Sequence, residues 1–177
     1  MKVFKISVIL FALTCGFSTN MLAQSKAVST KRPNIVVIIS DDHAYQAIGA
    51  YGSKLMPTPN IDRIAHEGVL FNNGYVTNSI CGPSRAVFLT GKYSHKNGFK
   101  DNENSRFDGS QDSFVKQLKN SGYQTALIGK WHLETQPQGF DFWQILPGQG
   151  QYYNPDFHMM DGSKKQKEGY VSDVIED

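Results

Sequence analysis

Cys81 begins the most chemically suggestive segment of the chain, Cys81-Gly-Pro-Ser-Arg85. A short helix is predicted over residues 83–90, because Pro83 suits a first helical turn and Gly91 suits the position just past a helix end. The positive end of such a helix favours an anion such as a thiolate, and Arg85 lies within one turn of it. The segment therefore indicates a thiolate nucleophile beside an anion clamp. The pentapeptide alone leaves open a small buried cysteine before a surface helix with a solvated arginine.

Asp41 and Asp42 directly follow the unbroken apolar run within residues 34–40. Because the run does not alternate, it predicts a strand buried on both faces, as in a parallel sheet covered by helices. Ligands bind at the carboxyl ends of strands in such sheets, and two consecutive carboxylates there could turn toward one cavity. Oxygen ligands without Cys or His partners suit Ca²⁺. The alternative is a solvated acidic turn.

Lys130 and His132 follow a second apolar run, residues 123–128, which predicts another buried strand. In extended backbone, residues i and i+2 face the same side, so both side chains could reach one anion. Charged donors of this kind stabilise negative charge that develops during a reaction. Taken alone, the pair is better explained as a surface lysine and a structural histidine.

The remaining pattern predicts an α/β fold in which strands and helices alternate. Apolar periodicity, capping residues and glycine stops predict the other elements. These are a helix at 60–67 with Ile61, Ile64 and Ala65 on one face, a strand at 69–76, a helix capped by Ser110 or Asp112 that carries Phe114, Val115 and Leu118, and a helix opening at 170–177. Residues 135–162 are rich in Gly, Pro, Gln and aromatics and predict ordered loops.

Residues 1–23 are typical of an export signal peptide, with Lys2 and Lys5 before an apolar stretch. That stretch is far shorter than the roughly 20 residues a membrane anchor needs, and the residues before Cys15 match a lipoprotein site only weakly. Residues 24–177 then form one exported, periplasmic or secreted domain. Without Lys2 and Lys5, 16 basic residues balance 16 acidic ones. This balance gives no general basic field for nucleic acid or an anionic membrane.

Four segments together resemble the N-terminal part of the type I sulfatase family. They are Arg32–Asp42, Pro57–Asp62, Cys81–Lys92 and Gly129–Leu133, and the resemblance covers residues 32–175. It implies an alkaline-phosphatase-like α/β/α sandwich with a mostly parallel central sheet. Family members are several times longer than residues 24–177, so the resemblance also implies a chain truncated at its C-terminus that would have little or no activity alone.

The resemblance assigns chemistry to the residues named above. It implies that a maturation enzyme oxidises Cys81 to formylglycine, whose hydrated form is the nucleophile. It implies that Asp41, Asp42 and the modified Cys81 bind one Ca²⁺, and that Arg85 holds the diol and sulfate. By the same resemblance, Lys130 and His132 bind sulfate as catalytic and substrate-binding residues, and Lys92 supports the diol. The remaining metal ligands and the leaving-group acid of the family lie further downstream.

Two stretches, 136–143 and 148–157, have the amide and aromatic content of a sugar-binding loop, although aromatics also pack cores. They resemble exported carbohydrate sulfatases that remove 6-O-sulfate from N-acetylglucosamine in glycosaminoglycans or mucin glycans. A related phosphatase or phosphodiesterase would share the strand-end aspartate, but such an enzyme usually has Thr or Ser as its nucleophile and binds two Zn²⁺ ions. Cys81 in its full motif argues against this alternative. A non-catalytic binding fragment is the third interpretation.

Overall fold

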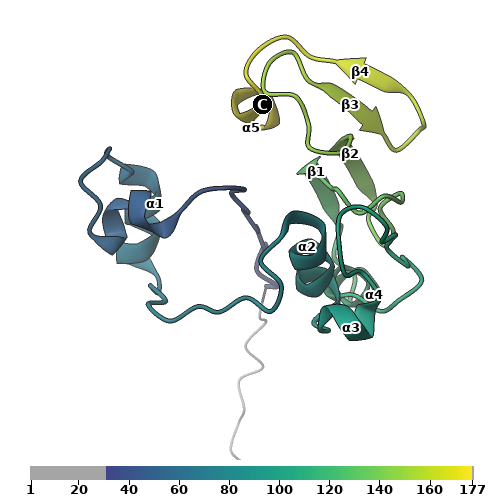
Figure 1. Ribbon diagram of the computed structural model, residues 1–177, viewed down its shortest axis with the longest axis horizontal. Helices are drawn as coiled ribbons and strands as arrows, with labels where there is room; N and C mark the ends of the chain where they lie inside the picture. Colours follow the sequence, from purple (N-terminus) through teal and green to yellow (C-terminus); the bar gives the residue numbers. More distant parts are fainter. Residues whose placement is uncertain (1–30, 177) are drawn as a thin grey trace, which may run out of the picture. The chain divides into compact units, whose positions relative to one another are not determined.

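The computed structural model describes residues 31–176 of the 177-residue chain. The predicted signal peptide, residues 1–23, lies outside this range. The chain divides into two compact units, Met1–Ile39 and Ser40–Asp177. All the helices and strands belong to the second unit, and Figure 1 follows them along the chain.

The strand predicted at residues 34–40 is not formed, and residues 31–39 have no regular structure. Val36 and Ile38 are 80% and 81% exposed. A strand buried on both faces needs hydrogen-bonded neighbours and covering helices, and no described segment pairs with this one. Its β-branched side chains therefore stay exposed, which corrects the prediction for this segment.

The second unit has two 3₁₀ helices, five α-helices and four strands among its described residues. In chain order they are η1 (Tyr45–Ala47), η2 (Gly49–Tyr51), α1 (Pro59–Glu67), α2 (Cys81–Thr90), α3 (Ser94–Asn97), α4 (Phe114–Asn120), β1 (Ala126–Lys130), β2 (Phe142–Leu146), β3 (Asp156–Met159), β4 (Lys164–Gln166) and α5 (Val171–Glu176). The helices predicted near 60, 83, 114 and 170 are confirmed.

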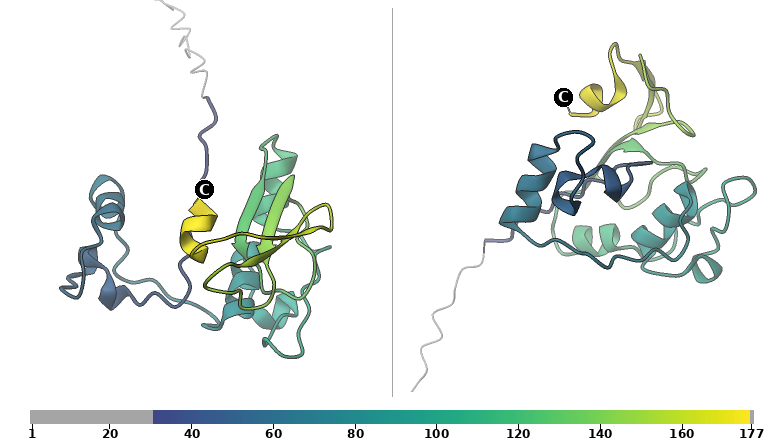
Figure 2. Two further views of the ribbon diagram at one scale, coloured as in Figure 1. Left: turned by 90° about the horizontal axis from the view of Figure 1, so that it is seen from above. Right: turned by 60° about the vertical axis from the view of Figure 1, so that its left-hand side comes forward.

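The four strands form one sheet in the order β1-β2-β3-β4. Only β1 and β2 are parallel, with Lys130 opposite Leu146, while β2–β3 and β3–β4 are antiparallel. Figure 2 shows β1 and β2 side by side. The described sheet is thus mixed rather than mostly parallel. Strands β2 and β3 lie within residues 135–162, which were predicted as loops, and β3 and β4 form an antiparallel hairpin.

Strand β1 is shifted by two to three residues from its predicted position and is not buried on both faces. It has one hydrogen-bonded neighbour among the described strands, and Ile128 is exposed on it. The strand predicted at 69–76 is absent, and Phe71 and Val76 are exposed there. In both segments the apolar run gave the residue types of a buried strand, but burial needs neighbours that the described residues do not supply.

The main core lies between helices α2 and α4 and the β1–β2 pair, and Figure 1 shows these elements together. It consists of Ala86, Leu89, Phe99, Phe107, Val115, Trp131, Leu133, Phe140, Trp143 and Ile145. A smaller core joins Leu146 and Phe157 to Val174 of α5. The first core holds the carboxyl end of β1 against the start of α2, so packing brings segments 45 to 50 residues apart into contact.

Helix α1 packs through polar contacts rather than through its predicted apolar face. Asp62 accepts hydrogen bonds from the Thr58 hydroxyl at 2.8 Å and from the Ala50 amide at 2.7 Å. Ile61 and Ile64 are exposed. The amphipathic pattern therefore located the helix, but the described residues do not cover its apolar stripe.

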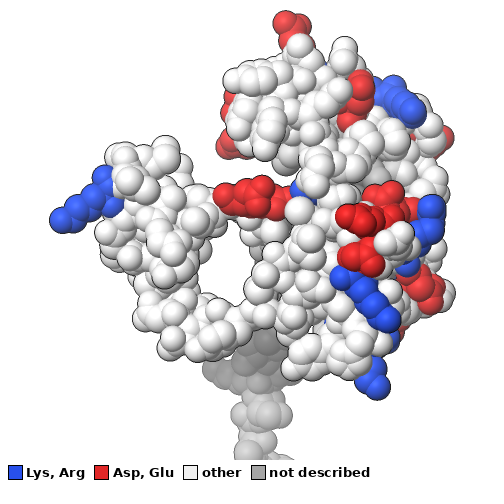
Figure 3. Space-filling view, in the orientation of Figure 1, with Lys and Arg blue, Asp and Glu red and all other residues white. Residues whose placement is uncertain are grey.

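Charged side chains of both signs lie intermixed over the face drawn in Figure 3. Lys119 and Asp141 form one such surface pair, with 2.7 Å between Nζ and Oδ1. Exposed pairs of this kind contribute little to stability. The Lys119–Asp141 pair therefore contributes little to how the described elements pack.

The N-cap of helix α4 lies one residue after Asp112 and three residues after Ser110, the two predicted caps. Ser113, not Ser110 or Asp112, is its N-cap, and the Ser113 hydroxyl accepts from the Lys116 amide at 3.4 Å. Ser110 instead donates its hydroxyl to Asp108 at 2.6 Å. A cap at residue 113 satisfies an amide of the first turn that would otherwise lack a partner.

We therefore expect Ser113→Ala to lower the free energy of unfolding by about 1 kcal/mol. The matched change Ser110→Ala removes an exposed hydroxyl and should cost less than about 0.5 kcal/mol. Urea unfolding followed by circular dichroism measures both. Equal losses from the two variants would contradict the assignment of the cap.

Candidate active site

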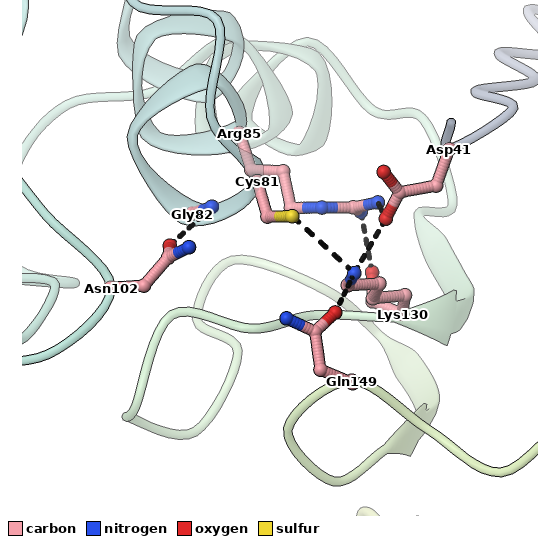
Figure 4. A network of polar contacts seen from close by, with 7 residues as sticks. All are labelled: Asp41, Cys81, Gly82, Arg85, Asn102, Lys130 and Gln149. Carbon is pink, nitrogen blue, oxygen red and sulfur yellow. Dashed lines mark hydrogen bonds and ion pairs between the residues drawn. The ribbon is translucent and has the colours of Figure 1, made fainter. Parts of the chain in front are cut away.

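The ammonium group of Lys130 is the centre of a polar cluster formed by Asp41, Cys81, Arg85, Lys130 and Gln149, here called the Lys130 cluster (Figure 4). Its Nζ lies 2.6 Å from Asp41 Oδ2 and 3.6 Å from Cys81 Sγ, and it donates to Gln149 Oε1 at 2.5 Å. Lys130 is the last residue of β1, and Cys81 is the first residue of α2. The sheet edge therefore brings a cation to the cysteine.

Arg85 connects the same elements from one turn further along α2. Its Nη1 donates to the Lys130 carbonyl at 2.7 Å, and its Nη2 lies 3.3 Å from Asp41 Oδ2. The planar guanidinium makes both contacts at once, which a lysine could not do in the same geometry. Arg85 thus holds the helix start, the strand end and Asp41 in one arrangement.

The two cations hold Asp41 in its ionised form. The hydrogen bond from Lys130 is the largest cause that lowers the pKa of Asp41. Burial, the next largest effect, opposes it, and the charges of Lys130 and Arg85 lower the pKa further. Opposite charges at hydrogen-bond distance stabilise a carboxylate in this way. Asp41, Cys81, Arg85 and Lys130, four of the residues predicted from the sequence, thus lie together.

His132 is not in the extended backbone that its i, i+2 spacing from Lys130 assumed. Its φ of +52° takes it out of extended backbone, and it lines a cavity of about 440 Å³ that Lys130 does not line. The side chain is buried, and Nδ1 has no hydrogen-bond partner among the described residues. Burial is the main cause that lowers the pKa of His132, and the Lys130 charge lowers it further. The ring is therefore biased toward its neutral form.

Asp42 and Lys92 lie outside the Lys130 cluster. Asp42 has a φ of +54° and an exposed side chain, and no polar partner of its carboxylate occurs among residues 31–176. Lys92 is exposed just past α2. Its charge contributes to the lowered pKa of Asp108, after the larger effects of Ser110 and Lys116.

Gln149 and Asn102 belong to the site but were not predicted as site residues. Gln149 accepts from Lys130, and Asn102 Oδ1 accepts from the Gly82 amide at 3.0 Å. Gln149 lies within the amide-rich stretch 148–157, which was the one available signal for it. Asn102 lies in a polar loop with no feature that distinguishes it from its neighbours, so only the fold reveals its contact.

A family model described as Sulfatase matches residues 33–175 of the chain. The chain belongs to the sulfatase family. It is 54% identical over 158 residues to the N-acetylglucosamine-6-O-sulfatase of Bacteroides thetaiotaomicron, a match that covers 88% of this chain and 28% of that protein. It is 39% identical over 129 residues to the human N-acetylgalactosamine-6-sulfatase, covering 63% of this chain and 25% of that protein.

Solved structures show the same relationship for this sulfatase-family chain. One, of a protein in complex with its substrate D-glucosamine-2-N,6-O-disulfate, matches with a TM-score of 0.78 and 55% identity, covering 81% of this chain and 29% of that one. The predicted alkaline-phosphatase-like α/β class is therefore confirmed at the level of the family fold. The chain spans 28% of the length of the Bacteroides relative.

The described residues offer only part of the ligand set that a calcium site would need. Asp41 and Asp42 offer carboxylate oxygens, which suit Ca²⁺, but such an ion takes about six to eight oxygen ligands. No group of three or more His, Cys, Asp or Glu side chains converges within residues 31–176. In this structure Lys130 and Arg85 neutralise Asp41 instead. The donor chemistry therefore fits one side of a calcium site.

The proposed sugar-binding stretches divide between core and surface. Phe140, Trp143 and Phe157 are buried and pack the two cores, so the packing interpretation is correct for them. Tyr152 and Tyr153 are exposed.

Among the described residues, no helix is both long and apolar enough to cross a membrane.

The electrostatics of His132 give a testable pH dependence. Removing the Lys130 charge by Lys130→Met should raise the pKa of His132, which histidine ring signals followed by NMR against pH would report. Since the folded-state pKa is below the unfolded value, the stabilising contribution of the neutral ring is complete above the unfolded pKa and declines as the pH falls through the folded one. The ring signals of exposed His66 on α1 should be the same in the wild type and in Lys130→Met. A His132 titration that is also the same in both proteins would contradict the coupling between Lys130 and His132.

Proposed function

We propose that this protein hydrolyses sulfate esters of carbohydrates, with Cys81 matured to formylglycine as its nucleophile. The observation that carries the proposal is the Lys130 cluster. It brings the one thiol among the described residues within 3.6 Å of an ammonium group, beside a guanidinium and a carboxylate. Two fixed cations next to a nucleophile suit a reaction in which an anionic sulfuryl group is attacked.

Maturation would convert the Cys81 side chain from CH₂–SH to an aldehyde. Two hydrogen atoms pass to the electron acceptor of a sulfatase-maturating enzyme, and the oxygen of a water molecule replaces sulfur, which leaves as hydrogen sulfide. Addition of a second water molecule gives a carbon with two hydroxyl groups. This chemistry needs a cysteine side chain at position 81 that a second protein can reach. Cys81 is half-buried at the start of its helix, so part of its side chain is accessible.

The hydrated side chain supplies both halves of the reaction. One hydroxyl oxygen forms a bond to sulfur while the bond from sulfur to the sugar oxygen breaks. The sugar oxygen takes up a proton, and the sugar leaves as an alcohol. The second hydroxyl then loses its proton, the carbonyl re-forms, and the bond between carbon and the sulfate oxygen breaks. Water restores the diol, so the net reaction consumes one water molecule per sulfate released.

The residues of the cluster have separate tasks in this proposal. Lys130 and Arg85 would neutralise the sulfuryl oxygens, and Arg85 would also orient the diol. Neutral His132, which lies near the charges of Lys130 and Asp41, would donate a hydrogen bond to the diol or sulfate. Lys92, exposed just past α2, would have the supporting role toward the diol that the family resemblance implies.

Asp41 and Asp42 would hold a Ca²⁺ ion together with the modified Cys81. Bound there, the ion would act as a Lewis acid toward the diol and sulfate oxygens. For Asp41 this requires its carboxylate to exchange part of its pairing with Lys130 for the metal, which would free the ammonium group for sulfate. Asp42 has no competing partner among the described residues.

The substrate class rests on the relatives and on the cavity beside the site. The Bacteroides relative is named an N-acetylglucosamine-6-O-sulfatase, and we propose 6-O-sulfated N-acetylglucosamine of glycosaminoglycans or mucin glycans as the substrate here. The cavity lined by His132 also has Gln136, Arg106 and Lys164 in its wall, groups that suit a hydroxylated, anionic sugar. Export directed by residues 1–23, with residues 24–177 as part of the catalytic domain, fits this role.

Cys81→Ala should abolish sulfate-ester hydrolysis by the full-length, matured protein without unfolding it, because the nucleophile is lost and no core side chain changes. A peptide mass across Cys81 of the wild-type protein should be about 18 Da below that of the thiol form. Hydrolysis of a matched phosphate ester is the control for a phosphatase. Retained sulfatase activity in Cys81→Ala, or a preference for the phosphate ester, would refute the proposal.

Asp42→Asn should weaken Ca²⁺ binding by at least about 10-fold, because it removes a charged ligand while an asparagine tolerates the positive φ of this position. Isothermal titration of metal-stripped, full-length protein with Ca²⁺ measures this without an activity assay. Asp161→Asn, an exposed aspartate on the β3–β4 turn, is the matched control and should bind Ca²⁺ like the wild type. Equal affinities in all three proteins would remove Asp42 from the metal site.

A further inference from the structure

We infer that Asn102 is a positioning residue for the nucleophile, because it caps helix α2 from a separate loop. The inference rests on the proposed function only in taking Cys81 as the nucleophile. The hydrogen bond from the Gly82 amide to Asn102 Oδ1 measures 3.0 Å and joins residues 20 positions apart (Figure 4). It reaches the residue directly after Cys81.

Helix α2 has no local cap. Its N-cap residue is Ile80, whose side chain has no oxygen to accept from the first amides. Pro83 has no amide hydrogen, and the Ser84 amide already donates to the Ile80 carbonyl at 2.9 Å. Cys81 and Gly82 are therefore the first-turn amides that need an acceptor from elsewhere, the task that a capping side chain normally performs, and Asn102 accepts from Gly82.

This pattern also changes the role expected for the helix start. The sequence predicted that several outward-facing amides would favour an anion at Cys81. In the structure, Pro83 has none to offer, and the amides of Gly82 and Ser84 are both engaged. Of the first-turn amides only that of Cys81 is left to face an anion, so Lys130 and Arg85 supply the full charges that balance a negative nucleophile, and Asn102 acts on position rather than on charge.

Gly82 is closely enclosed by other parts of the chain, and these contacts help to fix the position of the neighbouring Cys81. A Cβ added to Gly82 would lie 2.6 Å from Phe99 Cε1, 2.8 Å from the His132 carbonyl oxygen and 2.9 Å from Asn102 Oδ1. Phe99 and Leu133 nearby are fully buried. The helix start therefore fits against the chain just after β1, and Asn102 forms the polar wall of that contact.

The loop that presents Asn102 is held by its own side chains. Asp101 Oδ1 accepts from the amides of Glu103, Asn104 and Ser105 at 2.9, 2.6 and 3.3 Å. The Ser105 hydroxyl accepts from the amides of Lys100 and Asp101 at 2.9 and 3.1 Å. These bonds fix the backbone on both sides of Asn102, so its amide group is arranged in advance and loses little freedom on binding Gly82.

Three variants of the full-length protein test the inference. Asn102→Leu removes the acceptor at similar size, Asn102→Asp keeps an acceptor oxygen, and Ser113→Ala removes the cap of α4, away from the site. We expect Asn102→Leu to lower kcat between about 10- and 100-fold with little change in KM, as misplacement of a reacting group does. Asn102→Asp should recover most of kcat, and Ser113→Ala should leave it unchanged although both cap losses lower the melting temperature.

A second readout does not depend on sulfatase activity. In protein that has not been matured and still carries the thiol, the alkylation rate of Cys81 by iodoacetamide and the hydrogen exchange of the Gly82 amide report the local geometry. Both should change several-fold in Asn102→Leu and not in Ser113→Ala.

The outcomes separate the two proposals. If the wild type hydrolyses sulfate esters but Asn102→Leu keeps its kcat, or if Ser113→Ala loses as much, the role of Asn102 is refuted and the function stands. If the wild type hydrolyses none while alkylation and exchange change as expected, the function is refuted and the positioning role stands. Unchanged alkylation and exchange in Asn102→Leu would overturn the inference whatever the activity.

Discussion

The contact of the Lys130 ammonium group with Asp41 and Cys81 is the interaction on which the arrangement of the site depends. One cation at the end of β1 lies within 2.6 Å of a carboxylate oxygen and 3.6 Å of the sulfur at the start of α2. The three residues are separated by 40 and 49 positions in the chain. Because a charge so placed must be balanced locally, the ends of these segments are constrained together, and Arg85 reinforces the constraint.

Apolar packing makes that constraint possible. Trp131 and Leu133, directly after β1, are buried in the same core as Ala86 and Leu89 of α2. The core thus sets the distance between strand and helix before any polar contact is considered. The polar groups then adjust the last part of the geometry, with Asn102 at Gly82 and Gln149 at Lys130. Hydrophobic burial supplies most of the stability, and the hydrogen bonds orient the side chains of the site.

The site residues were more predictable than the strands. Cys81, Arg85, Asp41 and Lys130 come from short motifs to which the family resemblance gave their chemistry, and the fold brings them together. The strand predicted at residues 34–40 failed for a physical reason, since an apolar β-branched run becomes a buried strand only beside other strands. Strands β2 and β3 were missed because Gly, Pro and Gln dilute their signal within 135–162.

The sequence by itself determined which groups could react, where helices α1, α2, α4 and α5 lie, and that the chain has an α/β pattern. These follow from residue type and from periodicity, which act over a few neighbouring residues. Only the tertiary structure decided that Asp42 and Lys92 lie outside the Lys130 cluster, that His132 leaves extended backbone, and that Asn102 caps α2. Each of these depends on contacts between segments distant in the chain, whose register no local pattern encodes.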